Sequence, residues 1–117
     1  MNKLNIMANW IVNYVNLKDI DDFSKVTSYL DGRINFEDLD GSCFDIIYDV
    51  HKKQVEFVSK WQPNFELPIE LGVNLKIDFK YDYYNTATFE YGTLYLEKGE
   101  PIIQRFWDDT GKEIKYE

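Results

Sequence analysis

The chain has 117 residues and a net charge of −8 at pH 7, with 21 acidic residues against 13 basic ones. This length predicts one domain, residues 1–117, and the shortage of Lys and Arg argues against direct binding to nucleic-acid phosphates or to an anionic membrane. No apolar run approaches the roughly 20 residues that a membrane-spanning helix needs.

The chain contains a single cysteine, Cys43, and a single histidine, His51. A lone cysteine cannot form an internal disulfide, which fits a reducing compartment. The segment from Met1 to Met7 has one Lys and no long apolar stretch, so it does not have the pattern of a secretory signal. We therefore expect a cytoplasmic protein.

Hydrophobic periodicity predicts a strand at 7–17, a helix at 19–30 and a hairpin of 44–50 with 55–61. Residues 34–42 are expected to form a polar connection, in which a short strand at 34–36 stays open as an option. Asp19 is suited to cap the helix, and Gly32 follows its end. The apolar stripe of the helix begins at Ile20 and ends at Leu30. In the first hairpin strand, apolar and aromatic residues alternate as far as Val50.

The second half predicts a helix or ordered loop at 63–71, then strands at 75–82, 86–96, 101–107 and 113–116. Pro63 and Pro68 are expected to limit the length of the helix. Alternation begins at Leu75, and Gly92 marks a candidate bulge. Gly99 is suited to positive φ in the turn at 97–100, and a further turn is expected at 108–112.

The order of these elements predicts an α+β fold. Strand, helix, hairpin, helix and strand form the β-α-β-β-α-β pattern of a ferredoxin-like core. The later strands would extend the antiparallel sheet as a C-terminal meander, with both helices on one face.

Three short segments resemble a family of small phage- and plasmid-encoded proteins, the YubB-like group. Residues 7–15, Met-Ala-Asn-Trp-Ile-Val-Asn-Tyr-Val, resemble its opening M-x-N-W-C-x-N-x-L. Residues 57–63, Phe-Val-Ser-Lys-Trp-Gln-Pro, look like its F-x-T-x-W-x-P-P strand end. Residues 81–92 are similar to its Y-x-E-x-G-x-x-F-x-G segment, with Phe89 and Gly92 at the last two positions.

The chain departs from the family pattern at several positions. The family cysteine is Ile11, the second proline is Asn64, and the acidic-glycine pair is replaced near Tyr84-Asn85-Thr86. Residues 93–117 lie outside the resemblance. The family is largely of unknown function, so the resemblance implies a ferredoxin-like accessory protein of a mobile element and transfers no catalytic residue.

The sequence has few side chains suited to catalysis. Cys43 and His51 form the only candidate nucleophile–base pair, and along one strand they would lie roughly 26 Å apart, too far for a hydrogen bond. Zinc needs about four nitrogen or sulfur ligands, which the chain lacks. The scattered glycines match no phosphate-binding loop. We therefore expect no cofactor, no catalytic residues and no enzymatic activity.

The segment Asp38-Leu39-Asp40-Gly41 has some likeness to a calcium loop. An EF-hand would place Phe36 and Ile47 at ligand positions, so that motif is rejected. A looser cation site at Glu37, Asp38 and Asp40 stays open as an alternative, although we predict no metal.

The acidic excess favours a basic protein partner, because charge of opposite sign speeds encounter. We predict a non-enzymatic interaction protein of a phage or mobile element, in its concrete form an inhibitor that occupies the nucleic-acid-binding surface of a host CRISPR or restriction nuclease. The alternative is that the charge only keeps a small domain soluble. The candidate partner-binding residues are the following acids and one aromatic anchor: Asp78, Asp82, Tyr84, Asp108 and Asp109.

Two other classes of function remain open. The open face of the sheet suits a small-ligand or nucleotide sensor, and an exposed terminal edge strand suits a self-associating structural protein. RNA stacking on sheet aromatics is disfavoured, because Asp78 and Asp82 would repel phosphates. The rings considered for such stacking are Tyr14, Tyr84, Tyr91 and Tyr95.

Overall fold

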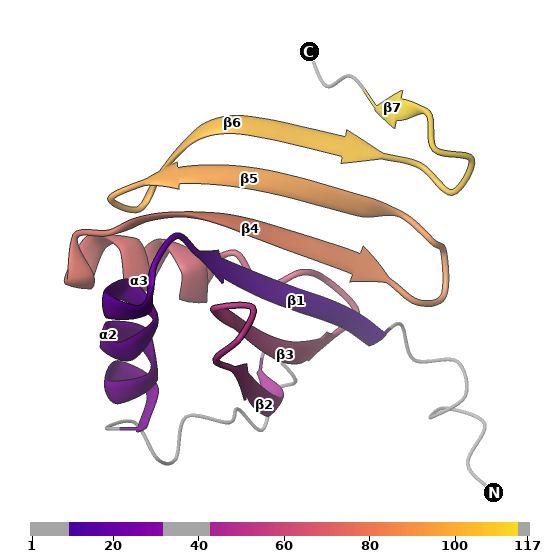
Figure 1. Cartoon of the computed structure of the whole chain (residues 1–117). Coiled ribbons are helices and arrows are strands. Elements are labelled where there is room, and N and C mark those ends of the chain that lie inside the picture. Colours follow the sequence, from indigo (N-terminus) through magenta and orange to yellow (C-terminus); the bar gives the residue numbers. More distant parts are fainter. Residues whose placement is uncertain (1–9, 32–42, 115–117) are drawn as a thin grey trace, which may run out of the picture.

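The computed structural model describes residues 10–31 and 43–114, which form two helices and a seven-stranded antiparallel sheet. Figure 1 shows both helices on the same side of the sheet. In chain order the elements are β1 (Trp10–Leu17), α2 (Ile20–Asp31), β2 (Phe44–Asp49), β3 (Gln54–Lys60), α3 (Glu66–Leu75), β4 (Asp78–Asn85), β5 (Tyr91–Glu97), β6 (Glu100–Trp107) and β7 (Glu113–Ile114). The strand order is β2-β3-β1-β4-β5-β6-β7, and the α+β prediction is confirmed.

Alternation along the central strands separates a buried face from an exposed one. In β1, Ile11, Asn13, Val15 and Leu17 are buried while the residues between them are more exposed. The same pattern continues in β3, β4 and β5. The helices contribute the apolar residues that cover this face: Phe23, Val26 and Leu30 from α2, and Leu67 and Leu71 from α3.

Several local predictions are confirmed. The Asp19 side chain accepts a hydrogen bond from the Asp22 backbone N–H at 2.9 Å, so Asp19 caps α2. Cys43 is buried in the core, and His51 lies exposed in the β2–β3 turn. Lys98 and Gly99 both have positive φ, as a two-residue hairpin turn of type I′ requires. The predictions at residues 34–36 and 37–40 lie outside the described residues.

The expected limit on the second helix is wrong. α3 continues to Leu75 and includes Pro68 in its first turn, where a backbone N–H has no partner within the helix and its loss costs little. The Asn64 side chain accepts the Leu67 N–H at 3.1 Å and so helps to cap the helix. Leu75 therefore ends a helix, and Lys76 follows in the left-handed conformation with φ of 55°.

Two strand predictions also need correction. β4 runs to Asn85 and the next strand begins only at Tyr91, since residues 86–90 form a turn instead of a strand. Gly92 is not a bulge, because it pairs in register with Tyr83 and Phe106. A Cβ at Gly92 would lie 2.4 Å from the Tyr83 ring, so glycine is needed here for close packing.

The alternation expected as far as Val50 does not bury the residues at the end of β2, and the α2 stripe does not begin at Ile20 as predicted. Tyr48 and Val50 are exposed, since β2 is the edge strand and a register shift follows Phe44 at Asp45, which has φ of 52°. Ile20, at the first residue of α2, is 48% exposed.

A buried amide joins three strands and one loop in the core. The Asn13 side chain donates to Ser59 Oγ at 3.0 Å and to the Phe57 carbonyl at 3.3 Å. Its Oδ1 accepts hydrogen bonds from the Tyr81 hydroxyl and from the Asn64 backbone N–H. Because an unpaired buried polar group is costly, this network fixes how β1, β3, β4 and the loop before α3 fit together.

Replacement of Asn13 tests this network. Asn13→Leu leaves the Tyr81 hydroxyl and the Asn64 N–H without their acceptor, so we expect a loss of about 3 kcal/mol in the free energy of unfolding. Urea denaturation measures this loss. Ser59→Ala removes one hydrogen bond to Asn13 and one to the Gln62 carbonyl, but it leaves the Asn13 Oδ1 acceptor in place, so it should cost less, about 2 kcal/mol. Equal losses in the two variants would contradict the central role of Asn13.

The pH dependence of stability offers a second test. Burial, with a smaller contribution from Tyr83, raises the pKa of Tyr81 well above its ordinary value of 10.0. The unfolded chain therefore ionises first, so this contribution to stability is complete below pH 10.0 and is lost as the pH rises above it. Tyr81→Phe should make the decline in stability above that pH shallower. An unchanged slope in denaturant titrations would contradict this assignment.

Candidate binding face

The face of the sheet opposite the helices, called the open face below, presents aromatic and polar side chains in cross-strand rows. One row runs from Val12 through Tyr84 and Tyr91 to Trp107. The next row consists of Glu56, Tyr14, Asp82, Thr93 and Arg105. Directly opposed side chains in neighbouring strands are close enough to act together. The open face is therefore one continuous surface across five strands.

A hollow of about 360 Å³ lies in the middle of the open face. Its lining comes from four neighbouring strands: Tyr14, Gln54, Asp82, Tyr83, Tyr84, Tyr91, Gly92 and Thr93. The rings of Tyr14, Tyr84 and Tyr91 and the Asp82 carboxylate thus share the same space, while the Tyr83 ring packs against the core. This volume lies at the small end of the range that ligand sites occupy.

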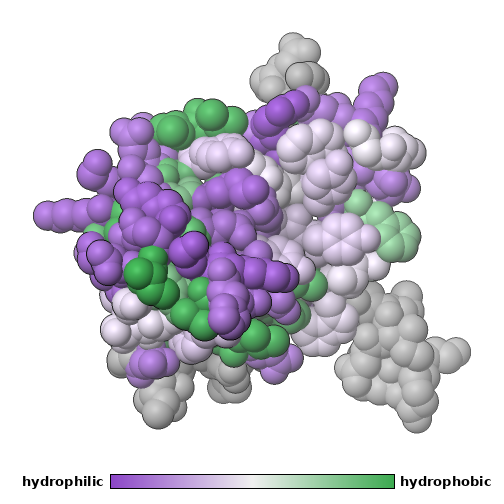
Figure 2. All heavy atoms as spheres, in the orientation of Figure 1, coloured by the Kyte–Doolittle hydropathy of each residue, from purple (hydrophilic) through white to green (hydrophobic). Residues whose placement is uncertain are grey.

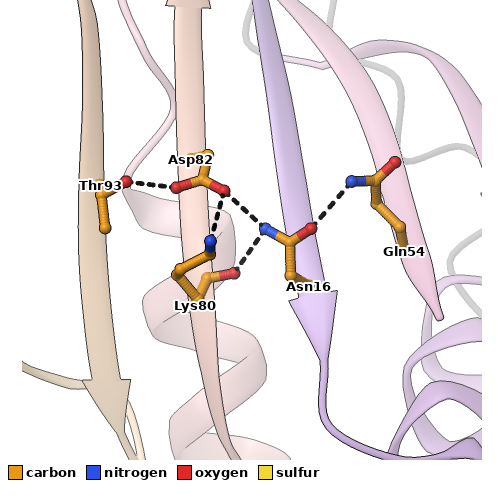
Figure 3. A network of polar contacts seen from close by, with 5 residues as sticks. All are labelled: Asn16, Gln54, Lys80, Asp82 and Thr93. Carbon is orange, nitrogen blue, oxygen red and sulfur yellow. Dashed lines mark hydrogen bonds and ion pairs between the residues drawn. The ribbon is translucent and has the colours of Figure 1, made fainter. Parts of the chain in front are cut away.

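Asp82 is the centre of a polar network that crosses the open face, shown in Figure 3. Its carboxylate accepts hydrogen bonds from Asn16 Nδ2 at 2.9 Å and from the Thr93 hydroxyl. Lys80 Nζ lies 3.5 Å from Asp82 Oδ2, and Asn16 Oδ1 accepts a hydrogen bond from Gln54 Nε2 at 2.8 Å. The network fixes the position of the Asp82 carboxylate, while 28% of the Asp82 side chain stays exposed.

Aromatic rings at both ends of the open face contact cations. Lys60 Nζ lies 5.6 Å from the centre of the Trp10 ring, and the Arg105 guanidinium lies 5.2 Å from that of Trp107. Trp107 also stacks on Tyr91 at 4.8 Å. Figure 2 shows mostly hydrophilic residues on the left and many residues of intermediate hydropathy, the class of Tyr and Trp, over the strands on the right.

The electrostatic environment of the hollow is negative on one side. Partial burial, with a contribution from the charge of Glu56, raises the pKa of Tyr14 above 10.0. At the far edge, Arg105 donates to Glu113 at 2.9 Å and 3.2 Å, and this pairing raises the pKa of the guanidinium. Tyr14 and Arg105 are protonated at neutral pH at their ordinary pKa values, and these upward shifts extend the pH range over which they stay protonated.

The structure brings together two of the five predicted site residues. Asp82 and Tyr84 both line the hollow. Asp78 lies at the start of β4, where its side chain accepts the Lys98 N–H at 3.0 Å and holds the β5–β6 turn. Asp108 accepts from Thr110 and Lys112 in the β6–β7 turn, and the Thr110 hydroxyl is the main cause of its lowered pKa. Asp109 is exposed in the same turn.

The sequence analysis did not identify the other polar members of the site. Asn16, Gln54 and Thr93 carry no signal by residue type, although their places in alternating strands put them on the exposed face. On sequence alone, Tyr14 and Tyr91 are candidates only for RNA stacking, which is disfavoured. Among the described residues, no His, Cys, Asp and Glu side chains group as a metal ion would require.

The comparisons with known proteins give no further assignment. No protein-family model, curated protein or solved structure matches the chain. Within residues 10–31 and 43–114, neither helix has the length and apolar character needed to cross a membrane. The fold and the open face together define an α+β protein with an aromatic sheet surface around one carboxylate.

The two central site residues should tolerate replacement. Asp82→Asn keeps the shape of the side chain, and Tyr84 is 38% exposed, so Tyr84→Leu leaves no large internal void. We expect each variant to lose about 1 kcal/mol or less in urea denaturation. A loss above about 3 kcal/mol would show that these residues are structural.

Proposed function

We propose that the protein is a non-enzymatic interaction module whose open face docks a basic segment of another protein. The single observation that carries the proposal is the hollow, where Tyr14, Tyr84 and Tyr91 surround the Asp82 carboxylate. Exposed aromatic side chains are typical anchors of protein interfaces. A carboxylate among them favours a cationic partner group.

The charges of the open face support a basic partner. Within the part of the chain that the structure describes, the bases of this face are engaged on the same face: Lys80 with Asp82, Arg105 with Glu113, and Lys60 with Trp10. Further acids, including Glu56 and Glu97, alternate onto this face. Opposite potentials across an interface speed encounter and exclude partners of like charge.

The class of partner that we propose is a host protein with a nucleic-acid-binding surface, such as a defence nuclease. The support is the acidic chain together with the resemblance to the YubB-like group, of which we propose the chain to be a member. We further propose a ferredoxin-like core. The order β2-β3-β1-β4 around two helices on one face supports this assignment.

Charge reversal on two faces tests the proposed docking. Glu56→Lys with Glu97→Lys reverses two open-face acids, whereas Asp21→Lys with Glu66→Lys makes the same change in net charge on the helices. A mixed Lys/Arg peptide serves as the probe, with affinity measured by isotope-edited NMR titration. We expect the open-face pair to weaken binding on the order of tenfold and the helix pair much less.

The docking proposal fails if both pairs weaken binding equally, because the peptide would then respond only to net charge. Sedimentation at several protein concentrations is the control for self-association. A dimer through the open face would also mask these residues, and it would contradict docking of a foreign segment.

The hollow also favours a second candidate, a small-ligand or nucleotide sensor. Its volume of about 360 Å³ suits a small molecule. A ligand at 100 times its dissociation constant stabilises a protein by about 2.7 kcal/mol, which thermal denaturation detects. A stabilising nucleotide would favour the sensor, and a panel without effect would favour the docking module.

A further inference from the structure

We propose that the hollow is the specificity site of the docking surface and takes one arginine side chain from an extended segment of the partner. This inference rests on the proposed function and names the group that the open face recognises. The occupant is a guanidinium, held between tyrosine rings and the Asp82 carboxylate.

The lining of the hollow fits a planar cation. Tyr14, Tyr84 and Tyr91 come from three neighbouring strands, and Asp82 lies in the row beside Tyr84 and Tyr91. Among the described residues, no cation lies over any of these three rings. Guanidinium stacks on aromatic faces and pairs with carboxylates in a fork, whereas ammonium is a compact and strongly hydrated charge. The combination of rings and carboxylate therefore favours arginine over lysine.

The open face already contains an internal example of this recognition. Arg105 lies 5.2 Å from the Trp107 ring centre while its Nε and one terminal nitrogen donate to the two oxygens of Glu113. The ring and the carboxylate thus hold one guanidinium together. Tyr91 pairs with Trp107 across β5 and β6, and Asp82 lies one strand further along, opposite Thr93. The hollow thus offers one ring and one carboxylate, those of Tyr91 and Asp82, to a guanidinium from outside.

Lys80 regulates access to this site. Its Nζ lies 3.5 Å from Asp82 Oδ2, and its side chain is 42% exposed. An exposed ion pair of this kind is weak, so an incoming guanidinium can displace it. Removal of the lysine charge should therefore strengthen arginine binding, which is an effect that a purely structural Asp82 would not produce.

The test uses the full chain and three peptides of equal length, each with Gly alternating with arginine, lysine or citrulline. Binding is followed by NMR titration of the open-face backbone amides. We expect the arginine peptide to bind about fivefold more tightly than the lysine peptide, with the citrulline peptide weakest.

Asp82→Asn and Tyr84→Leu should each remove most of the preference for arginine. Lys80→Met should raise affinity for the arginine peptide more than Lys98→Met, the matched control in the β5–β6 turn.

The outcomes separate this inference from the proposed function. Equal binding of arginine and lysine peptides on the open face overturns the arginine site and leaves the docking module intact. Failure of both charged peptides to bind the open face overturns both. Free arginine amide that binds as tightly as the peptide shows a small-molecule site and overturns recognition of a partner segment.

Discussion

The hydrogen bonds of Asn13 are the constraint on which the rest of the structure depends. Asn13 lies in β1, a central strand, and its amide joins β3, β4 and the loop before α3. The neighbouring core is apolar or aromatic, so water cannot replace these partners without cost. A shift of one residue in register would turn Asn13 outward and leave the Tyr81 hydroxyl unpaired. The buried amide thus specifies the register as well as stabilising it.

The composition of the open face follows from that register. With Tyr81 and Tyr83 turned toward the core, Asp82 and Tyr84 must point to the opposite side. Their cross-strand partners are then Tyr14, Thr93 and Tyr91. The contacts on the core face of the sheet explain why residue 92, beside Tyr91 and Thr93, is a glycine. Gly92 leaves room for the Tyr83 and Phe106 rings, and its backbone lines the hollow on the other side. Packing inside the sheet and the shape of the site outside it therefore share one residue.

Most of the fold could be predicted from the sequence because its strands are half-buried. The hydrophobic periodicity predicted the strands β1, β3 and β4, whose residues do alternate between buried and more exposed positions, and the cap at Asp19 marked the start of α2. The errors arose where local signals were ambiguous. Leu75 fits a strand alternation, but the left-handed Lys76 separates it from β4. Pro68 disfavours a helix interior and is harmless in the first turn. Whether a glycine marks a bulge or a close contact depends on side chains from other strands.

The candidate site was less predictable, because charge alone does not distinguish a carboxylate that binds a partner from one that organises the chain. Asp78 and Asp108 each accept backbone N–H groups in turns, so their charge is already used within the protein. Asp82 differs because its donors are side chains on an exposed surface, and an exposed lysine is one of them. Side-chain donors can move away when a stronger cation arrives, whereas backbone donors cannot do so without opening the turn. Under the proposed function, the partner engages a carboxylate that is held by side chains, and on the open face Asp82 is the carboxylate that also has aromatic rings around it.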